Sequence, residues 1–81
     1  MRESMTHQID QQLDACGLLC PEPVMLVHQS IRKMSAGDQL LVVATDPSTQ
    51  RDIPKFCAFL GHDLIFTEQE GTLYRYLIRK N

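Results

Sequence analysis

The chain has 81 residues, a formal net charge of −2 at pH 7, and a composition that is 43% hydrophobic and 22% charged. This length suits one small domain, and the balance of apolar and charged residues excludes a disordered or fibrous chain. Because Lys and Arg are spread along a slightly acidic chain, the strong basic footprint of a nucleic-acid-binding protein is also excluded.

The amino-terminal part predicts a frayed end followed by an edge strand. Residues 1–8 are polar and lack hydrophobic periodicity, so we expect a flexible terminus there and a single domain over residues 9–81. Apolar residues then alternate imperfectly with Gln and Asp, which predicts a short strand from about Gln8 to Ala15. No secretory signal and no apolar stretch near the roughly 20 residues of a membrane span is present, so we expect a cytoplasmic protein without membrane contact.

A first helix follows a glycine break at Gly17. Pro21 and Pro23 stand where missing amide donors are tolerated, in the first turn of a helix that we expect from about Pro21 to Ser35. The Ala36-Gly37-Asp38 run provides the stop. The apolar face of this helix is expected at Val24, Val27, Ile31 and Met34, which recur at helical spacing.

The middle of the chain predicts an interior strand and then a second helix. The run 39–45 is short, apolar and rich in branched residues, as expected for an interior strand of a sheet. Asp46 is the expected N-cap of the second helix, with Pro47 at its first position and Gly61 at its end. Pro54 predicts a bend or a restart, since it removes a backbone hydrogen bond at a cost of about 3 kcal/mol. The apolar stripe is expected at Ile53, Phe56, Cys57 and Leu60.

The carboxyl-terminal part predicts a β-hairpin. Residues 63–68 and 72–80 are rich in strand-forming residues, and the Gln69-Glu70-Gly71 run between them supplies a glycine for a tight turn. The order of elements is therefore β-α-β-α-β-β. Two helices with one apolar face each can share a core on one side of a four-stranded mixed sheet, so we expect an α/β (α+β) two-layer sandwich.

Cys20 is the candidate reactive residue. Three cysteines, an odd number, fit poorly with a disulfide framework, and a thiol at a helix start has its pKa lowered by the helix dipole. The supporting residues are Gly17 before the cysteine and the first-turn Pro21, Glu22 and Pro23. No His, Lys or Arg lies within three residues to act as a base, which suits a sulfur carrier better than a hydrolase. The plainer alternative is a small buried residue near a helix start.

Three stretches of the chain carry a family resemblance. They are Leu13-Asp14-x-x-Gly17-x-x-Cys20-Pro21-Glu22-Pro23-Val24-Met25, Asp46-Pro47-x-x-x-Arg51-Asp52-Ile53-Pro54-x-Phe56-Cys57, and Tyr74-Arg75-Tyr76-Leu77-Ile78-Arg79-Lys80. These stretches resemble the TusA family of small sulfur carriers, which includes SirA-like and YedF-like proteins. The resemblance implies a transferase that forms a persulfide on Cys20, receives sulfur from a cysteine desulfurase and passes it to an acceptor complex for 2-thiolation of the tRNA wobble uridine. It implies no cofactor, only indirect contact with tRNA, and a monomer when free.

Two positions depart from the family pattern. Leu19 stands where an arginine is common, which affects any partner contact made there. Cys16, four residues before Cys20, either forms a disulfide that discharges the persulfide or is a neutral loop substitution, and the strict geometry of disulfides favours the second interpretation.

The charged residues around the start of the second helix have two interpretations. Asp46, Arg51 and Asp52 form local pairs at that helix start or, as the resemblance implies, a partner-docking patch. At the last strand, a basic group either binds an acidic partner or protects an exposed sheet edge, and we favour protection. That group consists of Arg75, Arg79 and Lys80.

The remaining thiols and imidazoles receive no role. Cys57 lies on the apolar stripe of the second helix, so we expect its thiol to be buried and inert. His28, next to the apolar stripe of the first helix, and His62, just after the second helix, are expected to be surface or boundary residues. No paired ligand spacing predicts a metal site. Two rival functions stay open: a redox-sensing or regulatory module that binds protein or RNA, and a self-contained enzyme that takes sulfur from thiosulfate.

Overall fold

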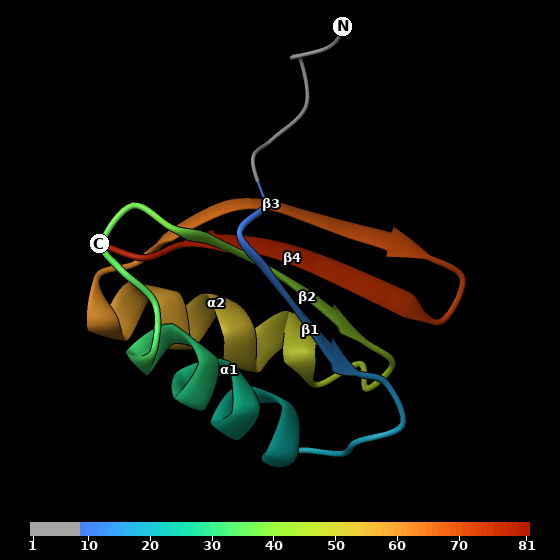
Figure 1. Ribbon diagram of the computed structural model, residues 1–81. Coiled ribbons are helices and arrows are strands. Elements are labelled where there is room, and N and C mark those ends of the chain that lie inside the picture. The colour runs from blue at the N-terminus through green and yellow to red at the C-terminus, as the bar shows by residue number, and fades with distance from the viewer. Residues whose placement is uncertain (1–8) are drawn as a thin grey trace, which may run out of the picture.

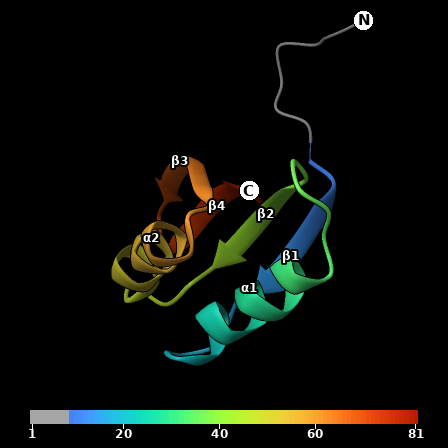
Figure 2. The ribbon, with the colours of Figure 1, turned by 90° about the vertical axis from the view of Figure 1, so that its left-hand side faces the viewer.

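The computed structural model describes residues 9–81, so the frayed end expected at 1–8 lies outside the described range. Four strands form one mixed sheet in the order β1-β2-β4-β3, and both helices cover the same face of it (Figures 1 and 2). The predicted two-layer sandwich with the order β-α-β-α-β-β is confirmed. The elements are β1 (Gln11–Ala15), α1 (Glu22–Arg32), β2 (Gln39–Ala44), α2 (Thr49–Leu60), β3 (Asp63–Glu70) and β4 (Leu73–Arg79).

The strand pairing follows from the lengths of the connections. β1 and β2 are parallel and in register from Gln11↔Leu40 to Ala15↔Ala44, an arrangement that needs a long crossover, which α1 supplies. β4 is antiparallel to both β2 and β3. The β3–β4 hairpin turns at Gly71, whose φ of 61° lies in the left-handed region that glycine adopts without a steric penalty. The predicted hairpin is thus confirmed, with β3 continuing to Glu70.

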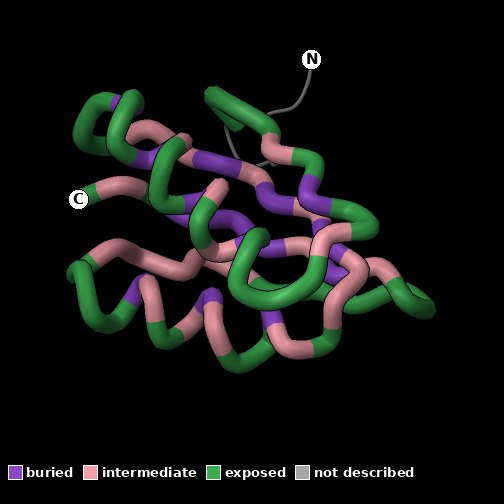
Figure 3. Tube along the Cα trace, turned by 90° about the horizontal axis from the view of Figure 1, so that it is seen from below, coloured by how far each residue is buried: buried purple, intermediate pink, exposed green. Residues whose placement is uncertain are grey.

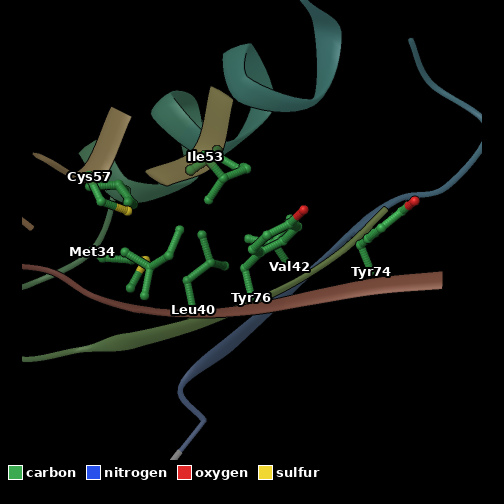
Figure 4. Packing of buried hydrophobic residues seen from close by; sticks show 10 residues of the cluster. Met34, Leu40, Val42, Ile53, Cys57, Tyr74 and Tyr76 are labelled. Atoms are coloured by element: carbon green, nitrogen blue, oxygen red, sulfur yellow. The ribbon is translucent and has the colours of Figure 1, made fainter. Parts of the chain in front are cut away.

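The hydrophobic core lies between the sheet and the two helices. Buried and exposed segments alternate along the trace, as expected for elements with one covered face (Figure 3). Ile53 and Cys57 reach from the helix layer towards the sheet (Figure 4). No helix in residues 9–81 is long and apolar enough to cross a lipid bilayer. The core cluster contains Val27, Ile31, Met34, Leu40, Val42, Ile53, Cys57, Tyr74, Tyr76 and Ile78.

The first helix is shorter than its hydrophobic pattern predicts. It ends at Arg32, and the predicted end at Ser35 is wrong. The Met34 amide bonds to the carbonyl of Ile31, a tighter turn than the α-helix, and the Asp38 carboxylate accepts the Ser35 amide at 3.1 Å. The carboxylate therefore competes with helix continuation, although Met34 stays buried as the pattern indicates.

The second helix begins later than predicted. Its N-cap is Ser48, so the expected N-cap Asp46 and first helical residue Pro47 are both wrong. The Asp46 carboxylate accepts the amide and the hydroxyl of Ser48, which closes a turn ahead of the helix. The helix then continues unbroken through Pro54, so the alternative of a restart there is wrong, and it ends as predicted at Gly61.

Candidate functional site

Cys20 lies in the loop between β1 and α1, directly before the N-cap Pro21, and is exposed. Because β1 and β2 are parallel, the loops that follow them emerge at the same edge of the sheet. The amide of Cys20 donates to Oδ2 of Asp46 at 2.6 Å, and the amide of Gly17 donates to Oγ1 of Thr45 at 2.9 Å. The loop after β2 therefore holds the loop that carries Cys20.

Asp46 is the centre of this connection. Besides the Cys20 amide, its carboxylate accepts the hydroxyl of Ser48 at 2.7 Å, and this bond is the largest cause that lowers the pKa of Asp46. Its backbone carbonyl accepts the hydroxyl of Thr49 at 2.7 Å, and that buried hydroxyl also lies 2.7 Å from the Tyr76 hydroxyl. A continuous hydrogen-bonded path thus leads from β4 in the sheet to the backbone of Cys20.

The thiol of Cys20 contacts the second helix. Its Sγ donates to Oδ2 of Asp52 at 3.1 Å, while Oδ1 of Asp52 accepts Nε of Arg51 at 2.9 Å. The hydrogen bond to Asp52 raises the pKa of Cys20, helped by desolvation and by the negative charge, while Ser48 and Arg51 act in the opposite direction. The expectation that the helix start lowers this pKa is therefore wrong, because a carboxylate accepts the thiol hydrogen bond.

An open apolar groove of about 770 Å³ begins at Cys20 and extends along the space between the two helices. Its wall includes Val24 of α1 and Phe56 and Phe59 of α2, and Phe59 is 88% exposed. Such exposure of a large aromatic side chain beside a reactive group is typical of a surface that another molecule covers.

The other predicted site residues are distributed around this centre. Pro21 is the N-cap, Glu22 lies in the first helical turn and Pro23 is buried beneath it. The three suggested docking residues, Asp46, Arg51 and Asp52, are instead brought together at Cys20. Within residues 9–81, no group of three or more potential ligands is placed to hold a metal ion.

The basic residues near the carboxyl terminus do not form a free positive edge. Arg75 pairs with Glu68 and Glu70 across the hairpin, and Arg79 pairs with Asp63. β4 also lies between β2 and β3, so these residues are not on an edge strand, and the favoured interpretation that they protect an exposed edge is wrong. The alternative, contact with an acidic partner, stays a prediction. Sequence order alone does not reveal that the last strand occupies an inner place. Lys80 donates to the carbonyl of Met34.

Cys16 and Cys20 are exposed free thiols, and Cys57 is a buried one. The amide of Cys16 donates to Oδ1 of Asp14 at 3.0 Å, and a hydrogen bond to the same carboxylate raises the pKa of the Cys16 thiol. Asp14 thus lies beside Cys16 as Asp52 lies beside Cys20. Whether Cys16 is a neutral loop substitution or a disulfide partner of Cys20 stays a prediction.

Cys57 is buried, 2% exposed, and its pKa is raised to about 11, mainly by desolvation. At pH 8 roughly one Cys57 in a thousand is then a thiolate. We expect a soluble maleimide to label the other cysteines of the native protein within minutes and Cys57 only after unfolding. Peptide mapping checks this prediction, and labelling of native Cys57 as fast as Cys16 would contradict it.

Sequence reasoning missed the contact between Cys20 and Asp52, which lie far apart in the chain. The only signal was topological, since parallel β1 and β2 bring both following loops to one edge. The His28 ring contacts the Phe56 ring, with centroids 5.7 Å apart, and His62 accepts the amide of Asn81. Each histidine thus has a contact of its own, and the thiol of Cys20 donates to Asp52.

The chain is similar to known proteins over most of its length. A family model described as "Sulfurtransferase TusA" matches residues 11–80. The "Sulfur carrier protein TusA" of Pseudomonas aeruginosa is 58% identical over 76 residues, which cover 94% of this chain and 96% of the relative. That of Pseudomonas entomophila is 59% identical over 71 residues, covering 88% and 89% of the two chains.

Among solved structures, a SirA-like protein from Desulfitobacterium hafniense is similar, with a TM-score of 0.75 at 20% identity. The alignment covers 85% of this chain and 95% of that one, and it shows the shared two-layer fold. The family match over almost the whole described chain, together with the high identity to curated relatives, shows that the chain belongs to the TusA family of sulfur carriers.

Proposed function

We propose that this chain accepts sulfur from a cysteine desulfurase as a persulfide on Cys20 and relays it to an acceptor protein for 2-thiolation of the tRNA wobble uridine. The observation that carries the proposal is the position of Cys20, an exposed thiol at the end of an open apolar groove. A carrier cysteine must be reached in turn by a donor and an acceptor. Such a relay takes place in the cytoplasm and needs no cofactor, and the free carrier is a monomer.

The chemistry needs one thiolate and one sulfane sulfur at each step. Cys20 loses its proton, and its sulfur attacks the terminal sulfur of the donor persulfide. The S–S bond of the donor breaks, the donor cysteine leaves as a thiolate, and Cys20 now holds the terminal sulfur. The same exchange with an acceptor cysteine regenerates Cys20, so sulfur moves without net oxidation or reduction.

The charges around Cys20 support a carrier that depends on partner proteins over an enzyme that uses thiosulfate. Asp52 accepts the Cys20 thiol and Asp46 accepts the Cys20 amide, so one carboxylate contacts the reacting sulfur and a second lies at the backbone of the same residue. A thiosulfate dianion approaching this position meets like charge, which disfavours its binding. Asp46, Arg51 and Asp52 remain our proposed docking residues, now placed beside the thiol that a docked partner has to reach.

The test is intact-protein mass spectrometry without reductant after incubation with a cysteine desulfurase and cysteine. We expect the wild type to gain the mass of one sulfur, which a reducing agent then removes. Cys20→Ser is expected to gain none, whereas Cys16→Ser is expected to load as the wild type does. A wild type that stays unmodified beside an active desulfurase would overturn the proposal and favour the regulatory module.

A further inference from the structure

The thiol of Cys20 is held by a charged group that is itself fixed. Asp52 lies in the first turn of α2, and its side chain is 21% exposed, which restricts its movement. One of its oxygens accepts Sγ–H of Cys20 at 3.1 Å and the other accepts Nε of Arg51 at 2.9 Å. Both oxygens therefore have a donor, and the carboxylate is aimed at the sulfur.

The charged groups around Cys20 come from three segments. The helix α2 contributes Asp52, Arg51 and Lys55, of which Lys55 shares the groove with Cys20. The loop after β2 contributes Asp46, which binds the backbone of Cys20. The helix α1 contributes Glu22 in its first turn. The carboxylate of Asp52 accepts the hydrogen bond of Sγ, and Arg51 also interacts with the Cys20 side chain.

We propose that Asp52 is a positioning residue that keeps Cys20 of the free carrier as a neutral, hydrogen-bonded thiol, so that a sulfur donor has to separate the two before transfer begins. This inference rests on the proposed function of Cys20 as the sulfur acceptor. The thiolate is the attacking form, and a carboxylate next to sulfur opposes its formation through charge repulsion and through loss of the hydrogen bond. The exposed Cys20 of the free carrier then reacts more slowly with stray electrophiles and oxidants than a thiolate would.

Asp52 acts by holding the proton on sulfur and not by removing it. Arg51 and Cys20 both donate to Asp52, and these bonds lower the pKa of its carboxyl group, which makes it a poor proton acceptor. The same contact raises the pKa of Cys20. During loading the Cys20 proton therefore passes to water or to the departing donor thiolate, while Cys20 forms the new S–S bond and the donor S–S bond breaks.

The test measures the rate of Cys20 alkylation by iodoacetamide against pH, in a Cys16→Ser background where Cys20 is the one exposed thiol of the described chain. Asp52→Asn removes the charge at nearly constant shape. We therefore expect the midpoint of the rate-against-pH curve, which reports the ionisation of Cys20, to move to lower pH. A shift of about one pH unit gives tenfold more thiolate below the midpoint, and lower intrinsic nucleophilicity reduces the gain in rate to about threefold.

Arg51→Gln is expected to act in the opposite direction, because Arg51 favours the Cys20 thiolate. Its midpoint should move to higher pH, with slower alkylation near neutrality. Damage to the fold by itself would expose Cys20 in both variants alike, so opposite shifts identify the electrostatic role. The matched control is Asp14→Asn, which removes a carboxylate beside Cys16 and should leave the Cys20 profile unchanged.

The inference would be overturned if Asp52→Asn and the Cys16→Ser background had the same alkylation midpoint. It would also be overturned if the Asp52 and Arg51 variants shifted this midpoint in the same direction. Alkylation needs no desulfurase, so this result is independent of whether the protein carries sulfur. A wild type that fails to load from a desulfurase would overturn the proposed function even if the two midpoints move as expected.

Discussion

A bacterial strain that lacks its own TusA and carries this chain with Cys20→Ser is expected to have no more 2-thiouridine in its tRNA than the strain without any copy. Cys20 is the exposed thiol at the apolar groove, and the serine oxygen that replaces it cannot form a persulfide. The expected effect is therefore complete loss and not a partial decrease. Mass spectrometry of nucleosides from digested tRNA measures it.

The matched control is Cys16→Ser, which changes another exposed thiol of the same loop. We expect it to restore thiolation to the level given by the wild-type chain, because Cys16 contacts Asp14 and lies outside the groove that begins at Cys20. Circular dichroism confirms that both variants fold. Thiolation restored by Cys20→Ser would contradict the relay and support a role in binding or regulation.

The helices and the two inner strands were predictable because each has buried residues along one face. Val27 and Ile31 recur at helical spacing in α1, and the continuous apolar run of β2 marks a strand covered on one side by helices and bordered by neighbours on both edges. The element boundaries were less predictable. At Asp38 and Asp46 a carboxylate bonds to nearby backbone amides, and this local competition with the helix leaves no mark in hydrophobic periodicity.

The site was predictable only as far as its cysteine. The proline-flanked Cys20 indicated a reactive thiol at a helix start, but the direction of its pKa shift depends on Asp52, a residue of the other helix. That contact requires the parallel pairing of β1 with β2, which places both following loops at one edge. Hydrophobic pattern predicts that a strand exists and does not fix its neighbours, which is also why the inner place of β4 was missed.

Ile53→Ala is expected to lower the free energy of unfolding by about 2–5 kcal/mol, the usual cost of truncating a large aliphatic side chain in a core. Ile53 is fully buried and points from α2 towards the sheet, where Tyr76 lies (Figure 4). A chain of this length has a total stability of roughly 4–12 kcal/mol, so the loss consumes a large part of it. Urea denaturation followed by circular dichroism measures the change.

Phe59→Ala on the same helix is the matched control. Phe59 is larger than Ile53 but 88% exposed, so its removal should change the free energy of unfolding by less than about 0.5 kcal/mol. A loss of several kcal/mol at Phe59 would show that this ring packs in the core and is not part of an open groove.

The same pair of variants separates stability from function. Ile53 packs in the core away from the groove, whereas Phe59 lines the groove at Cys20, so slower loading by a desulfurase in a fully folded Phe59→Ala protein would locate partner contact at the groove.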